Sequence, residues 1–163
     1  MQLITLSGLI GLEIVAIRYH YTSEDYGLQW FYAYLKLNDG TIIDIPQFDD
    51  NDYLELTEDN KKYLQERFDT GTPVNEKCQK ECVGQKIEDF FFTYEDNETD
   101  GDESAYIKLS NGYYLTERNC GPMGISGIDL LLLTEEQFLD ETTNAEKDIR
   151  SFLNTHQKDE TII

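Results

Sequence analysis

The sequence predicts an α+β fold in which two tandem β-β-β-β-α repeats form a mainly antiparallel sheet structure around a shared core. Three observations lead to this prediction: an internal sequence repeat, period-two alternation of apolar residues, and helix-capping signals after the last strand of each half. We expect a single domain over residues 1–163, with repeat halves at approximately 1–72 and 73–163 related by a pseudo-twofold axis.

The internal repeat is a series of matches that keep the same order in both halves. The matching pairs are residues 9–14 with 82–87, 33–40 with 105–112, and 54–60 with 131–137. Chance can supply one such match, but three in the same order indicate a duplication. A half of about 70 residues buries little surface alone, so we expect the two halves to share one core.

In the first half, alternation predicts a strand over 12–21 with Val15, Ile17, Tyr19 and Tyr21 facing the core. A second strand over 31–37 follows, and Asn38-Asp39-Gly40 predicts a tight hairpin into a third strand at 41–45. A fourth strand at 53–56 leads to Thr57, which is the expected N-cap of a helix over 58–68.

The second half shows the same succession of signals. Phe90, Phe92 and Tyr94 alternate on the core face of its first strand, and Asn111-Gly112 predicts the hairpin between strands at 105–109 and 113–117. After a strand at 128–133, Thr134 and Gln137 form a capping box that starts a helix. Thr143 and Glu146 form another capping box and predict a second helical piece carrying Ile149 and Phe152.

Charge decides which partners are compatible with the chain. The 163 residues contain 33 acidic and 13 basic side chains, a net charge of −20, together with 11 Tyr, 8 Phe and 1 Trp. So many aromatic residues predict a folded protein. The charge repels phosphate backbones and anionic membranes, so we expect no direct nucleic acid, no membrane and a basic protein partner. The alternative left open is that the acidity only keeps the protein soluble.

Two acidic segments are the candidate binding elements, at 49–52 and 95–103. Their carboxylates belong to Asp49, Asp50, Asp52, Glu95, Asp96, Glu98, Asp100, Asp102 and Glu103. An EF-hand is rejected, because Ile107 stands where the bidentate Glu is required and strands replace the flanking helices. Weak binding of divalent cations stays open. The sequence does not say whether the two segments are neighbours.

Aromatic residues next to the strands are the candidate anchors for a partner. Tyr34 and Tyr106 recur with Lys36 and Lys108 on the predicted outward face, as a structural ladder or as part of an interface. The residues that would extend an interface are Trp30, Tyr32, Tyr113 and Tyr114.

Nothing in the sequence defines a catalytic, cofactor or metal site. Cys78, Cys82 and Cys120 form an odd set that fits reduced thiols, and their spacing matches no common zinc module. Cys120 lies in a Gly-rich insertion, and a nucleophilic role there requires a base from His20 or His156. We expect no enzyme activity, no cofactor and no bound metal.

In size, acidity and lack of catalytic signatures the chain is similar in type, though not in residues, to bacterial immunity proteins. That similarity implies a cytoplasmic inhibitor that occludes a basic partner, such as a nuclease-like toxin. Cytoplasmic location also agrees with the absence of a signal peptide or membrane-length apolar run in the sequence. The alternatives are a nucleic-acid mimic, a small enzyme or ligand-binding domain that uses the Cys120 loop, and an interaction module without an inhibitory role. Oligomeric state stays open.

Overall fold

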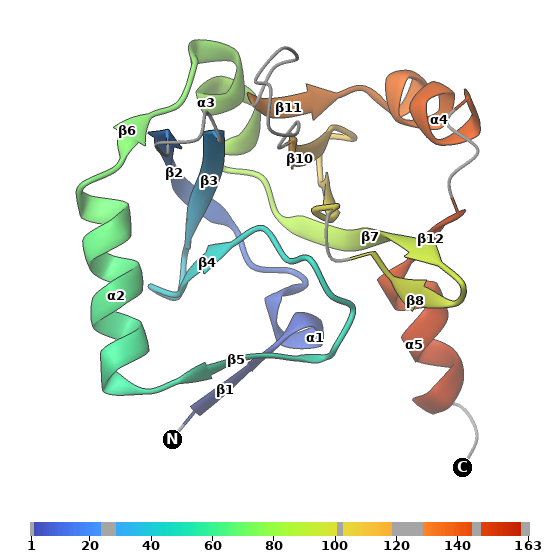
Figure 1. The fold of residues 1–163 in the computed structure, drawn as a ribbon, viewed down its shortest axis with the longest axis horizontal. Helices are drawn as coiled ribbons and strands as arrows, with labels where there is room; N and C mark the ends of the chain where they lie inside the picture. Colours follow the sequence, from blue (N-terminus) through green and yellow to red (C-terminus); the bar gives the residue numbers. More distant parts are fainter. Residues whose placement is uncertain (1, 24–28, 101–102, 119–128, 145–147, 161–163) are drawn as a thin grey trace.

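The computed structural model of the chain describes residues 2–23, 29–100, 103–118, 129–144 and 148–160 (Figure 1). Within these ranges the predicted α+β class is confirmed, with five helices and strands that pair in antiparallel ladders. None of the described helices is both long enough and apolar enough to cross a membrane.

The first half builds a four-stranded sheet in the order β4-β3-β2-β6, covered on one side by helix α2 (Figure 1). Its elements are β2 (Ile14–Ser23), β3 (Gln29–Leu37), β4 (Ile42–Asp44), α2 (Glu58–Asp69) and β6 (Thr72–Pro73). The predicted fourth strand, β5 (Asp52–Leu56), instead pairs with β1 (Gln2–Thr5) in a separate two-stranded sheet. The first helix of the chain is the short α1 (Leu6–Leu9).

The second half builds a larger sheet in the order β11-β10-β9-β7-β12, with β8 also paired to β7. Its strands are β7 (Ile87–Glu95), β8 (Glu98–Thr99), β9 (Tyr106–Leu109), β10 (Tyr114–Arg118), β11 (Asp129–Leu133) and β12 (Asp148–Ser151). Its helices are α3 (Glu76–Cys82), α4 (Glu135–Asn144) and α5 (Phe152–Glu160).

Local capping chemistry starts the two principal helices where the sequence predicts. The Asn60 backbone N–H donates to Thr57 Oγ1 at 3.1 Å before α2. Before α4, the Gln137 N–H donates to Thr134 Oγ1 at 3.2 Å and the Thr134 N–H donates to Gln137 Oε1 at 2.9 Å. The predicted capping box at Thr134 is therefore confirmed.

The second predicted capping box does not start a helix at Thr143. Helix α4 runs through Thr143 to Asn144, and Ile149 lies in strand β12, which pairs with β7. Glu146 lies outside the described residues. A strand forms here in place of the predicted helix because residues 148–151 pair with β7. In this strand Ile149 packs against the apolar cluster of Tyr106, Tyr114 and Phe138. Helix α5 begins only at Phe152.

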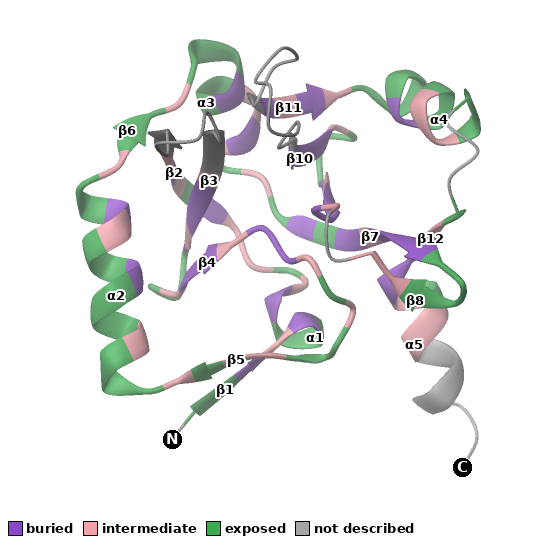
Figure 2. Cartoon of the chain, viewed as in Figure 1, coloured by how far each residue is buried: buried purple, intermediate pink, exposed green. Residues whose placement is uncertain are grey.

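The main core contains buried side chains from both halves, including Ile17 and Leu35 from the first and Phe90 and Ile107 from the second (Figure 2). The expectation that Val15 faces this core is wrong, because Val15 is 38% exposed. The β2–β3 register shifts between Ile14 and Ala16, so Ile14 and Ile17 take the core positions on either side of the irregularity.

The two sheets are joined by backbone hydrogen bonds between the loops that precede β2 and β7. The Gly11 N–H donates to the Ile87 carbonyl at 2.8 Å, and the Gly84 N–H donates to the Ile14 carbonyl at 2.8 Å. Glu13 and Lys86 form an antiparallel bridge between them. Gly11 and Gly84 have φ values of +92° and +91°, a conformation that favours glycine. We call these paired loops the seam.

Replacing Gly11 or Gly84 with alanine should lower the free energy of unfolding by about 1–2 kcal/mol at each position. Each glycine has open space around a built Cβ atom, so the cost comes from the backbone alone. Urea denaturation of Gly11→Ala and Gly84→Ala, with Gly11→Asn as the matched control, measures it. Asparagine tolerates positive φ better and should recover part of the loss. Unchanged stability in both alanine variants would contradict the role given to the seam.

Candidate functional site

The structure brings the two predicted acidic segments together. The chain between β4 and β5 leaves the first half and runs beside the β7–β8 hairpin (Figure 1). There the Tyr94 hydroxyl donates a hydrogen bond to Asp49 Oδ2, and His156 Nε2 lies 3.8 Å from the same oxygen. We call this region the acidic junction and define it by the residues Phe48, Asp49, Asp50, Asp52, Glu95, Asp96 and Glu98.

Local backbone geometry presents the carboxylates of the β7–β8 hairpin to solvent. Asp96 and Asn97 have φ values of 53° and 67°, the left-handed region that Asp and Asn tolerate in tight hairpins. Arg150 lies over the Tyr94 ring at 4.4 Å from its centroid, and its guanidinium donates to Asn97 Oδ1 at 3.1 Å. These contacts fix the hairpin while Glu95, Asp96 and Glu98 stay exposed.

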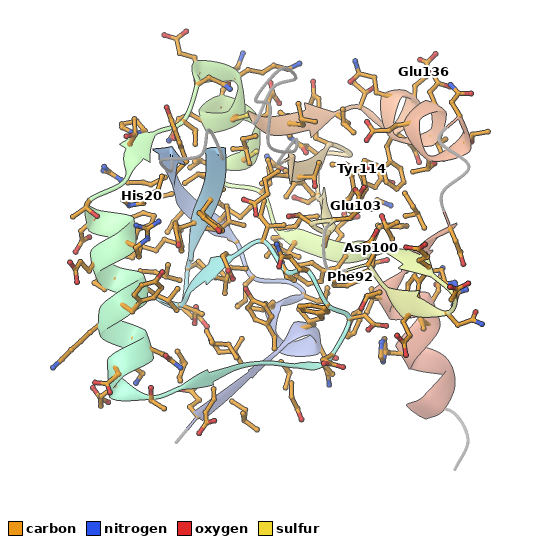
Figure 3. All side chains as sticks on the ribbon, viewed as in Figure 1. His20, Phe92, Asp100, Glu103, Tyr114 and Glu136 are labelled. Atoms are coloured by element: carbon orange, nitrogen blue, oxygen red, sulfur yellow. The ribbon has the colours of Figure 1, made fainter. Side chains whose placement is uncertain are left out.

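Five of the nine predicted carboxylates are exposed, and Asp49 is partly buried where it accepts from Tyr94. The other three also differ from the exposed five. Asp100 and Glu103 are partly buried in the segment that leads from β8 to β9 (Figure 3). The Asp100 N–H donates to the Thr93 carbonyl at 2.9 Å, which ties this segment to β7. Asp102 lies outside the described residues.

Exposed carboxylates are not confined to the acidic junction. Helix α2 carries Glu66 and Asp69 in exposed positions, and α4 carries Glu135, Glu136 and Asp140. The acidic junction differs from these helices in that it combines segments from both halves. It also includes Phe48, an aromatic side chain that is 53% exposed, although α2 carries an exposed aromatic side chain as well, Tyr63 at 57%. Phe48 was missed by the sequence analysis, although a lone aromatic residue directly before Asp49-Asp50 was the available signal.

Most of the predicted aromatic anchors are buried or partly buried. Tyr114 is 3% exposed and stacks on Phe138 beneath α4, with ring centroids 4.0 Å apart (Figure 3). Tyr34 and Tyr106 are also buried, so their predicted outward exposure is wrong: α2 and α4 supply the groups that cover that face. Tyr32 and Tyr113 are partly buried, and the Trp30 side chain lies outside the described part of the structure.

A cavity of about 170 Å³ lies next to Phe48, between the two halves. Glu117 from β10 lines it and is only 5% exposed. The Ala33 N–H of β3 donates to Glu117 Oε2 at 2.9 Å, and the Ser104 hydroxyl donates to Oε1 at 3.2 Å. Asp44 and Tyr53 also line the cavity, and the Tyr53 hydroxyl donates to Asp44 Oδ1.

Burial changes the acidity of the groups in this cavity. Desolvation raises the pKa of Glu117 to about 8; the Asp44 carboxylate adds to the rise, and the hydrogen bonds from Ala33 and Ser104 oppose it. Desolvation also raises the pKa of Asp44, against the hydrogen bond from Tyr53. At pH 7 the Glu117 side chain is therefore mostly protonated and uncharged.

The described residues contain no group of three or more His, Cys, Asp and Glu side chains that could hold a metal ion. Cys78 and Cys82 are buried in α3, and burial raises the pKa of the Cys82 thiol to about 12, which disfavours the thiolate that binds zinc. His20 Nε2 contacts the carbonyl of Arg67 in α2 (Figure 3). His156 is instead close to Asp49, with Nε2 3.8 Å from Oδ2. Cys120 and its Gly-rich loop lie outside the described residues.

Comparisons with protein-family models, with curated proteins and with solved structures found no match to this chain. The acidic junction and the adjacent cavity therefore have to be interpreted from their own geometry and charge.

The natural protein should lose stability as the pH rises because Glu117 ionises, and Glu117→Gln should remove this loss. The folded state holds the Glu117 proton up to a pKa of about 8, against an ordinary value of 4.5, so this group's contribution to the free energy of unfolding falls as the pH rises between those values. Relative to the glutamine variant, the natural protein should lose on the order of 4 kcal/mol between pH 5 and pH 9. Urea denaturation at pH 5, 7 and 9 measures this difference, and a difference that does not change with pH contradicts the assignment.

The hydrogen bond between Asp49 and Tyr94 should couple the two acidic segments energetically. A double-mutant cycle with Asp49→Asn and Tyr94→Phe should give a coupling free energy of about 1–2 kcal/mol, because the acceptor is a carboxylate in a partly buried setting. Chemical denaturation at pH 7 supplies the four stabilities. Purely additive effects of the two substitutions would mean that the contact does not hold the segments together.

Proposed function

We propose that this protein is an acidic, cytoplasmic binding protein that occludes a basic protein partner, in the manner of an immunity protein that neutralises a nuclease-type toxin. The observation that supports it is the Asp49–Tyr94 hydrogen bond, which makes one acidic surface out of two segments far apart in the sequence. A partner that covers this surface would contact both halves of the chain at once.

Charge and anchoring would play different parts in this binding. A net charge of −20 attracts a cationic protein over long distances and speeds the encounter, most strongly at low ionic strength. Affinity requires an apolar contact that excludes water, and the exposed Phe48 ring at the acidic junction offers one. The surrounding carboxylates would then pair with Lys and Arg side chains at the rim.

We also infer that the chain is a tandem duplication with pseudo-twofold symmetry. Several correspondences support this inference: reciprocal hydrogen bonds at the seam, positive φ at Gly40 and Gly112 in the two tight turns, and matching register shifts near Ile14 and Ile87. In addition, α2 is followed by β6 paired to β2, and α4 is followed by β12 paired to β7. The acidic junction lies where such related halves meet.

Neutralising the acidic junction should slow association with the partner more than neutralising carboxylates elsewhere. The test variant carries Asp50→Asn, Glu95→Gln and Glu98→Gln, and the matched control carries Glu55→Gln, Glu66→Gln and Asp69→Asn on β5 and α2. All six side chains are exposed, and each variant removes three negative charges. At low ionic strength the test variant should associate at least about tenfold more slowly, and the control less than about twofold.

The partner for this measurement is obtained by capture from a lysate at low salt and then purified, and stopped-flow kinetics give the association rate constants. The proposal predicts a cationic protein whose own activity is inhibited by equimolar complex formation. Equal slowing by the two triple variants would show that the acidity acts only through net charge. A larger effect of the control variant, with its substitutions on β5 and α2, would favour the alternative that this region mimics a nucleic acid.

A further inference from the structure

The cavity next to Phe48 is lined by two carboxyl groups, and no cationic group is described beside them. Asp44 and Glu117 line it from the first and second halves, and their described neighbours supply neutral donors: Tyr53 to Asp44, and the Ala33 amide and Ser104 to Glu117. Among the side chains that the structure describes, which leave out that of Arg118, no Lys, Arg or His forms a hydrogen bond or ion pair with either carboxylate. Buried carboxyl groups are ordinarily paired with a cation, so the buried Glu117 is an exception, and the partly buried Asp44 beside it adds a second carboxyl group.

Glu117 also has acceptor capacity left over. An ionised carboxylate offers about four lone-pair sites, and the two donors that reach Glu117 fill one on each oxygen. Glu117 is 5% exposed, so bulk water supplies little else. A group that enters the cavity with several N–H donors would satisfy these sites and supply the missing positive charge.

The other walls of the cavity suit a flat cation. The residues that line it include three aromatic ones, Tyr32, Phe48 and Tyr53. Aromatic faces attract cations, and they favour the planar, weakly hydrated guanidinium over the compact ammonium. One water takes up about 30 Å³ of liquid, so a cavity of about 170 Å³ can admit a guanidinium head group and part of its stem.

The position of the cavity connects it to the acidic junction. Phe48 lines the cavity and is also the exposed aromatic residue of the acidic junction. A side chain that projects from a protein docked over Phe48 and Asp49 would therefore reach the cavity mouth.

We propose that the Asp44–Glu117 cavity is a specificity pocket that receives one arginine side chain of the basic partner. This inference rests on the proposed function for the identity of the partner, but the pocket can be tested without it. The guanidinium would donate to Glu117 and Asp44 while stacking on the aromatic wall. Entry of the cation favours the ionised form of Glu117, so binding would release a proton at neutral pH.

The pH dependence follows from the groups that face Glu117, which are Asp44 from β4, Tyr53 from β5 and Ser104. Burial raises the pKa of Glu117, Asp44 and Tyr53, and Tyr53 stays a neutral donor throughout the working range. Glu117, with a pKa of about 8, changes charge between pH 6 and pH 9. Because its ionised fraction rises by well over tenfold across that interval, a guanidinium should bind at least about tenfold more tightly at pH 9 than at pH 6.

The test uses N-acetyl-arginine amide as the probe and N-acetyl-citrulline amide, its uncharged analogue of nearly the same shape, as the control ligand. NMR titration of the full chain follows the Tyr32 and Tyr53 ring signals at pH 6 and pH 9. We expect saturable shifts with the arginine probe, tighter binding at pH 9 and no saturation with the citrulline analogue. Glu117→Gln should abolish the pH dependence, and Asp44→Asn should weaken binding at least about fivefold. Glu66→Gln, at an exposed position of α2 outside the acidic junction, should change neither.

The outcomes separate the pocket from the proposed function. The pocket proposal is overturned if the arginine probe does not saturate, or if Glu117→Gln changes stability but not probe binding. Glu117 would then be a structural carboxylic acid. This conclusion would hold even if a cationic protein still bound with strong salt dependence. If the probe binds as described while no cationic protein associates with the acidic junction, the pocket is supported and the proposed function fails. Equal binding of the arginine and citrulline probes would also overturn the pocket proposal, because the cavity would then select shape without charge.

Discussion

The seam between the Gly11 and Gly84 loops is the constraint on which the rest of the structure depends. Its backbone hydrogen bonds start β2 and β7 at a common point and hold the two sheets side by side. Once the sheets are held in this way, the amides of Ala33 and Ala105 face the opposite half and need acceptors there. Glu117 accepts from the Ala33 amide, and the Pro46 carbonyl accepts from the Ala105 amide at 2.7 Å.

The candidate site is a consequence of these two hydrogen bonds between the halves, which we call the crossings: Ala33 to Glu117 and Ala105 to Pro46. The Pro46 contact carries the chain from the first half onto the second, and three residues later Asp49 contacts Tyr94 of β7. The Glu117 contact buries a carboxyl group that would be better solvated outside, and the raised pKa of Glu117 is the result. The same two crossings therefore produce an acidic surface and an acidic cavity next to each other.

The sequence predicts features that depend on local chemistry more successfully than features that depend on packing between halves. The Thr134 capping box and the tight turns at Gly40 and Gly112 involve neighbouring residues, and the structure contains them. Strand β12 replaces the helix predicted after Thr143 because pairing with β7 outweighs a local capping signal. Tyr34 and Tyr106 looked exposed because period-two alternation identifies two faces of a strand but not that a helix covers the second face.

The site was predictable in part for the same reason. The acidic segments are visible in the sequence, but their meeting depends on the crossing at Pro46, and no local signal encodes that contact. Glu117 was not singled out among 33 acidic residues, since its burial is decided by the opposite sheet.

The central claim is that the acidic segments of both halves act as one recognition surface for a basic protein. Hydrogen exchange measured by mass spectrometry, on the free protein and on its complex with the purified basic partner, tests it most directly. The account predicts slowed exchange in residues 47–53 and 93–98 together, with α2 and α4 unchanged. Protection confined to α2 or α4, or to only one of the two acidic segments, would contradict it.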